Sequence, residues 1–517
     1  MTPPHPKTSP TNTWDTSAYY LALTLFLFIS LCPIWLTPYP AMHDYPNHLA
    51  RAHVLSQYHT VPHYQETYEL LWRPIPNLAM DLILPPLLSL ISVETASKIF
   101  LSLTIALLTL GLHILGSTVN GRPHWSALIA TYFTYNFAFS YGFVNYLFGM
   151  GLFFLALAAW LRWRGAWTLP RSLAMAGLLS LCYLAHLSSV VFLMICVGGI
   201  TLMDIVRART VSLQHLAGLW PIVPVLLLHA ISNQGTTQTT EMIWWQPIVV
   251  KKAIGLLYPF LSYSLLIDLT VGLLFIAVMT LAYLIKVGRF FNREILICAL
   301  LFLAVYFIAP MSGGVQSSYI DRRFLLPVLV LVVLAIRLDL SRAMGRLVLS
   351  GLLLLSLIRV GSVWTTWSAI GNEIQAQVRL LDRLPDGGRL YPMFVHDESD
   401  KATWLHDMHF FHIPLYATIY RHAIVPTLYA WKAANPLFPR KPDAGFQMVE
   451  KGTPVEKVGW DTIFSQYHHL WGYKLPDEFK SYLSARAHVL AEVGDGILYR
   501  LDRQPVSTDS MAEPLLD

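Results

Sequence analysis

Long apolar stretches separated by short polar segments recur along the chain from Tyr19 to Trp364. Most are about 18 residues or longer, the length that a helix needs to cross the hydrocarbon core of a bilayer. The pattern predicts an α-helical polytopic membrane protein with about eleven transmembrane helices. They are expected at 18–36, 95–116, 125–141, 143–161, 172–187, 188–205, 214–231, 264–285, 294–311, 324–337 and 347–365.

Three apolar segments depart from a simple span. The segments 125–141 and 324–337 are short, which predicts helices that are tilted, broken or differently bounded. Leu82–Ile91 is apolar, but it contains Pro85 and Pro86. We interpret it as an interfacial or re-entrant helix within the first loop rather than as a span.

The composition supports a membrane protein and no other class. Hydrophobic residues make up 55% of the 517 residues and charged residues 13%, whereas a soluble domain has roughly 25% charged residues. The net charge of +5 is not gathered into a basic run interleaved with aromatics, so nucleic-acid binding is not predicted. No disulfide framework is expected, because the cysteines all fall inside apolar runs: Cys32, Cys182, Cys196 and Cys298.

The distribution of Lys and Arg predicts the orientation. With the N-terminus inside, the inner segments contain Lys7, Arg122, Arg162, Arg164, Arg171, Arg207, Arg209, Lys286, Arg289, Arg293, Arg337, Arg342 and Arg346. The longer outer loops between spans contain only Arg51, Arg73, Lys251, Lys252, Arg322 and Arg323. We therefore expect a multi-pass protein of the plasma (inner) membrane, with outer loops at 37–93, 232–262 and 312–323.

The polar region after the last span should form a small extracytoplasmic α/β domain. Strand-like runs at Arg389–Val395, Ile463–Tyr473, Ala487–Ala491 and Gly496–Leu501 alternate with helical stretches such as Asp477–Ala485. The expected organisation is a cytoplasmic tail (1–17), a transmembrane domain with a long first outer loop (18–365), the α/β domain (366–503) and a disordered tail (504–517).

Asp44 is the strongest candidate for chemistry. It lies just after the first span, and Pro46 starts a new segment in which Asn47–Leu55 has the pattern of a helix. His48 and Arg51, four and seven residues beyond Asp44, can share a face with it. In a partly dry pocket this carboxylate can act as a general base. The alternative is that Asp44 only caps the helix.

Asp321-Arg322-Arg323 is the second candidate. Two adjacent arginines on the outer side run against the positive-inside bias, and guanidinium is the group best matched to phosphate oxygens. The alternative is a pair of interfacial anchors on a short span.

Other polar residues also fall on the predicted outer side. Glu241 and Trp244, with Trp245, combine a carboxylate with rings that can stack on sugars or sit at the membrane interface. The remaining candidates, for which helix caps or interfacial anchors are the alternative, are Tyr141, Asn145 and His186, with Asn136, Tyr146, His229, Gln246 and Asp268. The spacing of His406, His409 and His412 is compatible with a metal, but the sequence does not require a divalent cation.

This arrangement resembles the GT-C superfamily of integral-membrane glycosyltransferases. Those enzymes have a long first outer loop with interfacial helices, an acidic residue just after the first span and often a soluble outer C-terminal domain. Asp44 matches that acid by position, and Arg322 and Arg323 are similar in placement to phosphate-binding basic residues. The resemblance implies inverting transfer of a sugar from a polyprenyl-phosphate donor to a hydroxyl of a glycan, lipid or protein, with Asp44 as general base and the arginines holding the leaving phosphate.

Two other functions remain open. A transporter or flippase of lipid-linked sugars should have polar groups through the whole membrane depth, whereas here the inner halves of the spans are nearly devoid of them apart from His113 and terminal charges. A non-enzymatic protein of envelope assembly would leave Asp44 without a purpose.

Overall fold

The computed structural model describes residues 13–232, 241–313, 318–396, 407–432, 434–441, 446–447 and 449–502. The chain divides into two compact units. The first comprises Met1–Pro40, Trp72–Ile83 and Glu94–Ser368, and the second Ala41–Leu71, Leu84–Val93 and Ala369–Asp517. Most of the segment after the first span thus belongs to the same unit as the C-terminal part.

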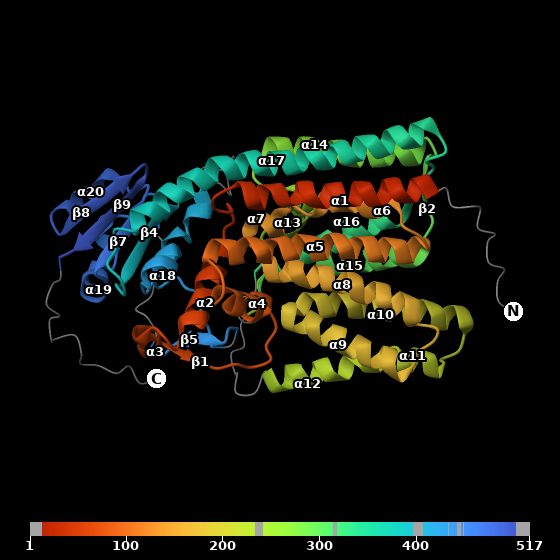
Figure 1. Ribbon diagram of the computed structural model, residues 1–517, viewed down its shortest axis with the longest axis horizontal. Helices are drawn as coiled ribbons and strands as arrows, with labels where there is room; N and C mark the ends of the chain where they lie inside the picture. The colour runs from red at the N-terminus through yellow and green to blue at the C-terminus, as the bar shows by residue number, and fades with distance from the viewer. Residues whose placement is uncertain are drawn as a thin grey trace. The chain divides into compact units, whose positions relative to one another are not determined.

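The first unit is a bundle of helices, several of which run side by side (Figure 1). Its helices are α1 (Thr13–Leu36), α5 (Val93–Asn120), α6 (Trp125–Ala130), α7 (Phe137–Tyr141), α8 (Val144–Trp163), α9 (Leu169–Ala185), α10 (Leu187–Ala208), α11 (Leu213–Ala217), α12 (Val223–Ser232), α13 (Ile248–Gly255), α14 (Leu265–Leu284), α15 (Arg293–Ile308) and α16 (Leu325–Leu334). The long helix α17 (Ala343–Leu381) belongs to this unit as far as Ser368 and to the second unit from Ala369. A short antiparallel pair joins β2 (Gly288–Phe290) to β3 (Ile336–Leu338), and α4 (Ala79–Leu88) begins in this unit.

Helix lengths confirm a multi-pass membrane protein. Among the described residues, six helices are long and apolar enough to cross a membrane: α1 from Thr16, α5, α8, α10, α14 and α17. The spans predicted at 172–187, 294–311 and 324–337 correspond to the shorter helices α9, α15 and α16. The apolar segment with two prolines, interpreted as an interfacial helix, forms the short helix α4.

The segment 125–141 is broken, as its length suggested. It contains α6, a 3-10 turn at Thr131–Phe133 and then α7. The side chain of Asn136 accepts hydrogen bonds from the backbone N–H groups of Ala138 and Phe139, which starts α7. Gly142 ends the helix in the left-handed conformation, with φ of 96°. Asn136 is therefore a helix cap.

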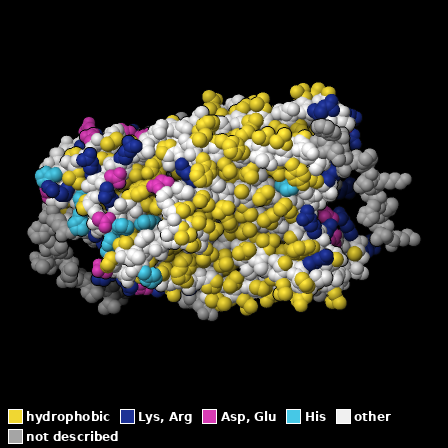
Figure 2. All heavy atoms as spheres, in the orientation of Figure 1, with side chains coloured by type: hydrophobic (Ala, Val, Ile, Leu, Met, Phe, Trp, Pro, Cys, Tyr) yellow, Lys and Arg dark blue, Asp and Glu magenta, His cyan; other side chains and the backbone are white. Residues whose placement is uncertain are grey.

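The surface of the first unit matches a bilayer-embedded protein. Hydrophobic side chains cover the visible face of its helices, and Lys and Arg gather at the end where α1 begins (Figure 2). At that end Arg164 pairs with Asp204 at 3.5 Å and with Glu294 at 2.8 Å. Basic residues gathered at one end are what the predicted inner side requires, and the orientation stays a prediction.

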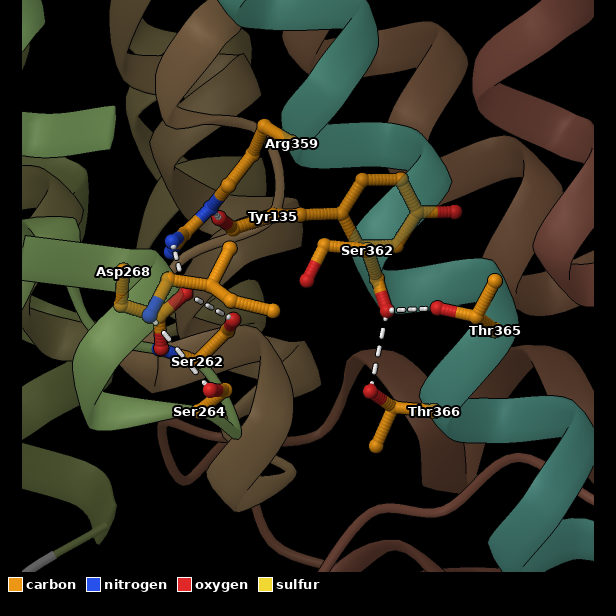
Figure 3. Close-up of polar contacts among 9 residues, drawn as sticks. Tyr135, Ser262, Ser264, Asp268, Arg359, Ser362, Thr365 and Thr366 are labelled. Atoms are coloured by element: carbon orange, nitrogen blue, oxygen red, sulfur yellow. Dashed lines mark hydrogen bonds and ion pairs between the residues drawn. The ribbon is translucent and has the colours of Figure 1, made fainter. Parts of the chain in front are cut away.

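Asp268, a polar residue within the apolar part of the chain, belongs to a buried ion pair. Its carboxylate accepts a hydrogen bond from Arg359 of α17 and is held by the hydroxyl of Ser262 at 2.8 Å (Figure 3). The Nε of Arg359 also donates to the carbonyl of Tyr135 at 3.0 Å. Asp268 and Arg359 are 1% and 2% exposed. The pair therefore ties α14 and α17 to the segment between α6 and α7.

The second unit contains a five-stranded sheet in the order β6-β4-β7-β9-β8. The neighbours of β4 are parallel to it, while β9 is antiparallel to both of its neighbours. The strands are β4 (Leu390–His396), β6 (Val449–Glu450), β7 (His469–Tyr473), β8 (Ala487–Val493) and β9 (Gly496–Leu501), and a separate antiparallel pair joins β1 (Tyr68–Leu70) to β5 (Leu437–Pro439). Helices α2 (Tyr45–Gln57), α3 (Pro62–Thr67), α18 (Tyr416–Arg421), α19 (Trp460–Gln466) and α20 (Asp477–Ser484) complete it.

One strand expectation is wrong. Ile463–Gln466 lies in α19, and only His469–Tyr473 of that run is a strand. Trp460, Ile463 and Phe464 are all buried, and their spacing of three and four residues is that of a helix rather than of a strand. The Ile and Phe content had suggested a strand, but the burial period shows a helix.

Candidate functional site

Asp44 stands where the chain enters α2. Its backbone carbonyl accepts from the N–H groups of Asn47 and His48, at 3.1 and 3.2 Å. Its side chain makes no capping hydrogen bond. The carboxylate is 7% exposed and points elsewhere, so capping does not account for the acid at this position.

The contacts of the carboxylate converge on one of its oxygens. Tyr429 donates a hydrogen bond to Oδ1 of Asp44 at 2.9 Å. The Nε2 atoms of His43 and His412 lie 3.4 and 3.6 Å from the same oxygen. An acid held by one oxygen can accept a proton at the other.

Asn47 fixes this arrangement. Its amide N donates to the carbonyl of Thr427 at 2.7 Å, and its amide O accepts from the backbone N–H of Tyr429, also at 2.7 Å. The two bonds define which end of the amide is nitrogen. That nitrogen also lies 3.1 Å from Nδ1 of His412, so Nδ1 is an acceptor. In the neutral ring the proton of His412 is then on Nε2, which lies 3.1 Å from the hydroxyl of Tyr429.

The protonation states suit a general base. Burial alone would raise the pKa of Asp44, but the facing His43 and His412 outweigh it and lower that pKa below its ordinary value. Burial lowers the pKa of His412 to about 4 and raises the pKa of Tyr429 well above its ordinary value. At neutral pH Asp44 is therefore a carboxylate, flanked by a neutral imidazole and a phenol.

His48 and Arg51 lie on the same side of α2 near Tyr429. The rings of His48 and Tyr429 are 5.7 Å apart. Arg51 is 0% exposed, and its Nη1 donates to the carbonyl of Tyr429 at 3.3 Å. Burial, followed by the charge of Arg51, lowers the pKa of His48 to about 3. The sequence thus predicted a shared face, and the structure adds Tyr429 as the residue that the face contacts.

His43, Asp44 and His412 could be considered a metal site, because one ligand atom of each lies within 4.8 Å of the others. His43 fits, since its Nδ1 donates to the carbonyl of Met408 at 2.6 Å and leaves a lone pair on Nε2. His412 does not fit, since its hydrogen bond with Asn47 puts the proton on Nε2. Two ligands are fewer than the three of a typical catalytic zinc site.

In the first unit, Arg322 lies among aromatic rings. Its guanidinium carbon is 3.4 Å from the ring centre of Tyr258, 4.0 Å from that of Trp245 and 4.9 Å from that of Tyr319. Tyr319 has φ of 55°, which is uncommon for a bulky residue. Arg322 is 8% exposed, and its Nε and Nη1 have no hydrogen-bond partner among the described residues. A buried guanidinium with open donors is suited to bind an anion.

Asp321 has a different role from its neighbour. Its Oδ2 accepts from Nζ of Lys252 at 2.7 Å and from Nε1 of Trp245 at 3.0 Å. Lys252, which is 2% exposed, also donates to the carbonyls of Tyr306 and Ala309, both at 2.8 Å. Asp321 is thus part of a buried ion pair.

Arg323 connects the same site to α10. Its Nη1 is 3.1 Å from Nε2 of His186, and its Nη2 donates to the carbonyl of Ser318 at 3.0 Å. Its backbone carbonyl accepts from the hydroxyl of Tyr146 at 2.8 Å. Arg322 and Arg323 both line a pocket whose described walls contain no Asp or Glu; the other lining residues are Asn136, Phe137, Ala138, Phe143, Tyr146, Tyr258, Pro259, Tyr319 and Leu326. The pocket is therefore positively charged.

The other predicted site residues are mostly structural or peripheral. Asn145 accepts from the backbone N–H of Met80 and donates to the carbonyl of Asn77, which fixes a loop. The ring of Tyr141 packs 5.3 Å from that of Tyr319, beside the pocket. Glu241 and Trp244 are exposed, and Trp245, not Trp244, contacts Arg322. His229 lies 3.3 Å from the Tyr183 hydroxyl, and His406 lies outside the described residues.

The residues that complete the two sites were not predicted from the sequence. Tyr429 and Asn47 carry no motif of their own, and their partners lie more than 300 positions away along the chain. Lys252 was counted only as an outer base. Its position in an apolar segment that also contains Ile254 and Leu256 was the one available signal that it is buried.

No family model matches the chain, and no curated protein matches it in sequence. Among solved structures, the chain is similar to ArnT from Cupriavidus metallidurans bound to undecaprenyl phosphate, with 11% identity, a TM-score of 0.48 and coverage of 95% of this chain and 98% of that chain. It is also similar to the apo state of that protein, with 12% identity, a TM-score of 0.45 and the same coverage. The function therefore has to be inferred from this chain's own residues.

Proposed function

We propose that this protein is a GT-C-type membrane glycosyltransferase that moves a sugar from a polyprenyl-phosphate donor to a hydroxyl acceptor on the extracytoplasmic face. The observation that carries the proposal is the buried carboxylate of Asp44 after the first span. It is held at one oxygen by Tyr429 and the neighbouring imidazoles, and it makes no helix cap. The buried acids Asp268 and Asp321 each pair with an Arg or a Lys, whereas the neighbours of Asp44 are two imidazoles and a phenol, so a structural ion pair of that kind does not account for it.

In the proposed reaction Asp44 accepts the proton of the acceptor hydroxyl. The oxygen freed of its proton attacks the anomeric carbon of the donor sugar and forms the new glycosidic bond. The bond between that carbon and the phosphate oxygen breaks, and its electron pair stays on the phosphate. Polyprenyl phosphate leaves with one more negative charge than the donor carried, and the proton remains on Asp44 until solvent removes it.

The arginines would hold the leaving group. A phosphomonoester carries about −1.5 to −2 charges at pH 7. The pocket lined by Arg322 and Arg323 has two guanidinium groups and no acidic residue among its described walls. Positive charge held in place before the reaction stabilises the charge that develops on the phosphate. No step requires a metal, in agreement with the proton on Nε2 of His412.

The proposed location is the plasma membrane, with the second unit outside the cytoplasm. The basic residues at the end of the first unit where α1 begins support this orientation (Figure 2). A polyprenyl-phosphate donor is itself a membrane lipid, so a site at the outer ends of spanning helices could reach its phosphate.

The proposal is tested with purified protein in liposomes and a panel of polyprenyl-phosphate-linked sugars. Release of polyprenyl phosphate in the presence of hydroxyl acceptors is the expected result. Movement of intact donor between leaflets without release would instead favour the flippase. If properly folded protein neither releases polyprenyl phosphate nor moves any donor tested, a non-enzymatic role in envelope assembly would remain.

A further inference from the structure

We infer that Lys252 and Asp321 form a positioning pair whose purpose is to leave the Nε and Nη1 donors of Arg322 open to the phosphate anion. The inference rests on the proposed function, because the anion is the phosphate of the carrier. Asp321 then does not bind the substrate directly. Lys252 neutralises its charge, so that the carboxylate does not compete with the phosphate for Arg322.

The first support is that Asp321 and Arg322 are adjacent in the chain but do not pair. The carboxylate of Asp321 is 0% exposed, and its Oδ2 lies 2.7 Å from Nζ of Lys252. The guanidinium of Arg322 lies over the rings of Tyr258 and Trp245 instead. Side chains of neighbouring residues in a helical turn point in different directions, and here the carboxylate of Asp321 faces Lys252 while Arg322 faces the pocket.

Lys252 has the contacts needed to hold Asp321 there. Its ammonium group has three N–H donors, and the three acceptors around it are Asp321 and the carbonyls of Tyr306 and Ala309, at 2.7 to 2.8 Å. Every donor of the buried amine is therefore used, and its position is fixed. Trp245 completes the arrangement, because its N–H donates to Asp321 while its ring lies under Arg322.

The charges around the pocket follow from this pairing. Lys252 and Asp321 cancel, which leaves the charges of Arg322 and Arg323 without a carboxylate among the described residues of the pocket wall. Two guanidinium groups on the pocket wall match the dianion of a phosphomonoester better than the monoanion of the phosphodiester donor. The pair thus favours the leaving phosphate over the bound donor.

The test compares three proteins for binding of undecaprenyl phosphate: wild type, Lys252→Met and the double variant Lys252→Met/Asp321→Asn. In the single variant Asp321 loses its partner and should pair with Arg322, which should weaken binding roughly 10- to 100-fold, the scale of a charge-assisted hydrogen bond. The double variant removes both charges and should restore binding to within a few-fold of wild type. A purely structural role of Lys252 would instead lower the melting temperature of Lys252→Met and leave the affinity of the folded protein unchanged, so both are measured.

The double variant Asp268→Asn/Arg359→Met is a matched control, because it removes another buried ion pair of the same unit. It should change the melting temperature and not the affinity for undecaprenyl phosphate. If Lys252→Met does not fold, the rescue variant still decides, because it leaves no unpaired buried charge. Loss of binding in that variant, or normal binding in Lys252→Met, overturns this inference alone. Failure of the wild type to bind overturns the proposed function with it.

Discussion

Replacing Arg322 by lysine should weaken binding of polyprenyl phosphate while the protein stays folded. The guanidinium is a flat group stacked on Tyr258 and Trp245, with Nε and Nη1 open among the described residues. Lysine keeps the charge but offers a single ammonium that cannot stack or make a two-pronged contact. The change therefore separates an anion site from an interfacial anchor, for which either charge would serve.

The magnitude follows from the hydrogen bonds that lysine cannot reproduce. A hydrogen bond to a charged group contributes about 1.5–3 kcal/mol. Loss of one such bond corresponds to a dissociation constant roughly 10- to 150-fold higher. Because the positive charge remains, most of the long-range attraction should persist, so the effect should lie at the lower end of this range.

The assay is direct binding of undecaprenyl phosphate to detergent-purified protein, with the melting temperature measured in parallel. Arg337→Lys is the matched control, because Arg337 also stacks on a ring, that of Phe291 at 4.2 Å, but is exposed and does not line the pocket. Normal affinity of Arg322→Lys, with affinity of the control also unchanged, would refute the assignment of Arg322 to the phosphate.

Three further predictions use other parts of the chain. Acid should destabilise the second unit through His53, whose pKa burial lowers to about 4. The folded state binds this proton less readily than the unfolded state, so the stability is full above pH 6.5 and is lost below it, by about 2 kcal/mol at pH 5. A free energy of unfolding, measured with denaturant, that falls with acid no more steeply in wild type than in His53→Phe would contradict this. Chelators should leave transfer unchanged, because the proton on Nε2 of His412 leaves too few metal ligands, and activity that EDTA removes and a divalent cation restores would show this reasoning to be wrong. A cysteine introduced at exposed Ser481 should be labelled from the outer face and one at exposed Gly165 should not, and the opposite labelling pattern would reverse the proposed orientation.

The sequence predicted the long helices of the first unit because the bilayer demands long apolar helices, but the span expected at 214–231 is divided into α11, a 3-10 turn at Trp220–Ile222 and α12. The break within 125–141 was also foreseeable, since Asn136 and Gly142 are residues that start and end helices. The end of α17 could not be predicted, because the helix continues to Leu381, well beyond the apolar stretch that would lie in a membrane. In a polar segment the helix continues only through contacts such as Gln377 with the carbonyl of Val493, which have no local signal.

The candidate site was predicted in part. Asp44 could be singled out because an acid at the end of a span is costly without a purpose. Its partners could not, because His412 and Tyr429 reach it only through tertiary folding. His412 was noticed for its spacing to His409, yet it contacts Asp44. Asp321 was assigned to substrate binding, and only the position of Lys252 shows that its charge is already paired.

The central claim, that Asp44 is the general base of a sugar transfer, is tested most directly by Asp44→Asn in the polyprenyl phosphate release assay. Asparagine keeps the size and can still accept the hydrogen bond of Tyr429, but it cannot accept a proton. Release should fall roughly 100-fold or more, while binding of undecaprenyl phosphate and the melting temperature stay near wild type. Asp386→Asn is the control, because Asp386 also faces a histidine, at 2.9 Å from His422, but is exposed. Release within a few-fold of wild type in folded Asp44→Asn would contradict the claim.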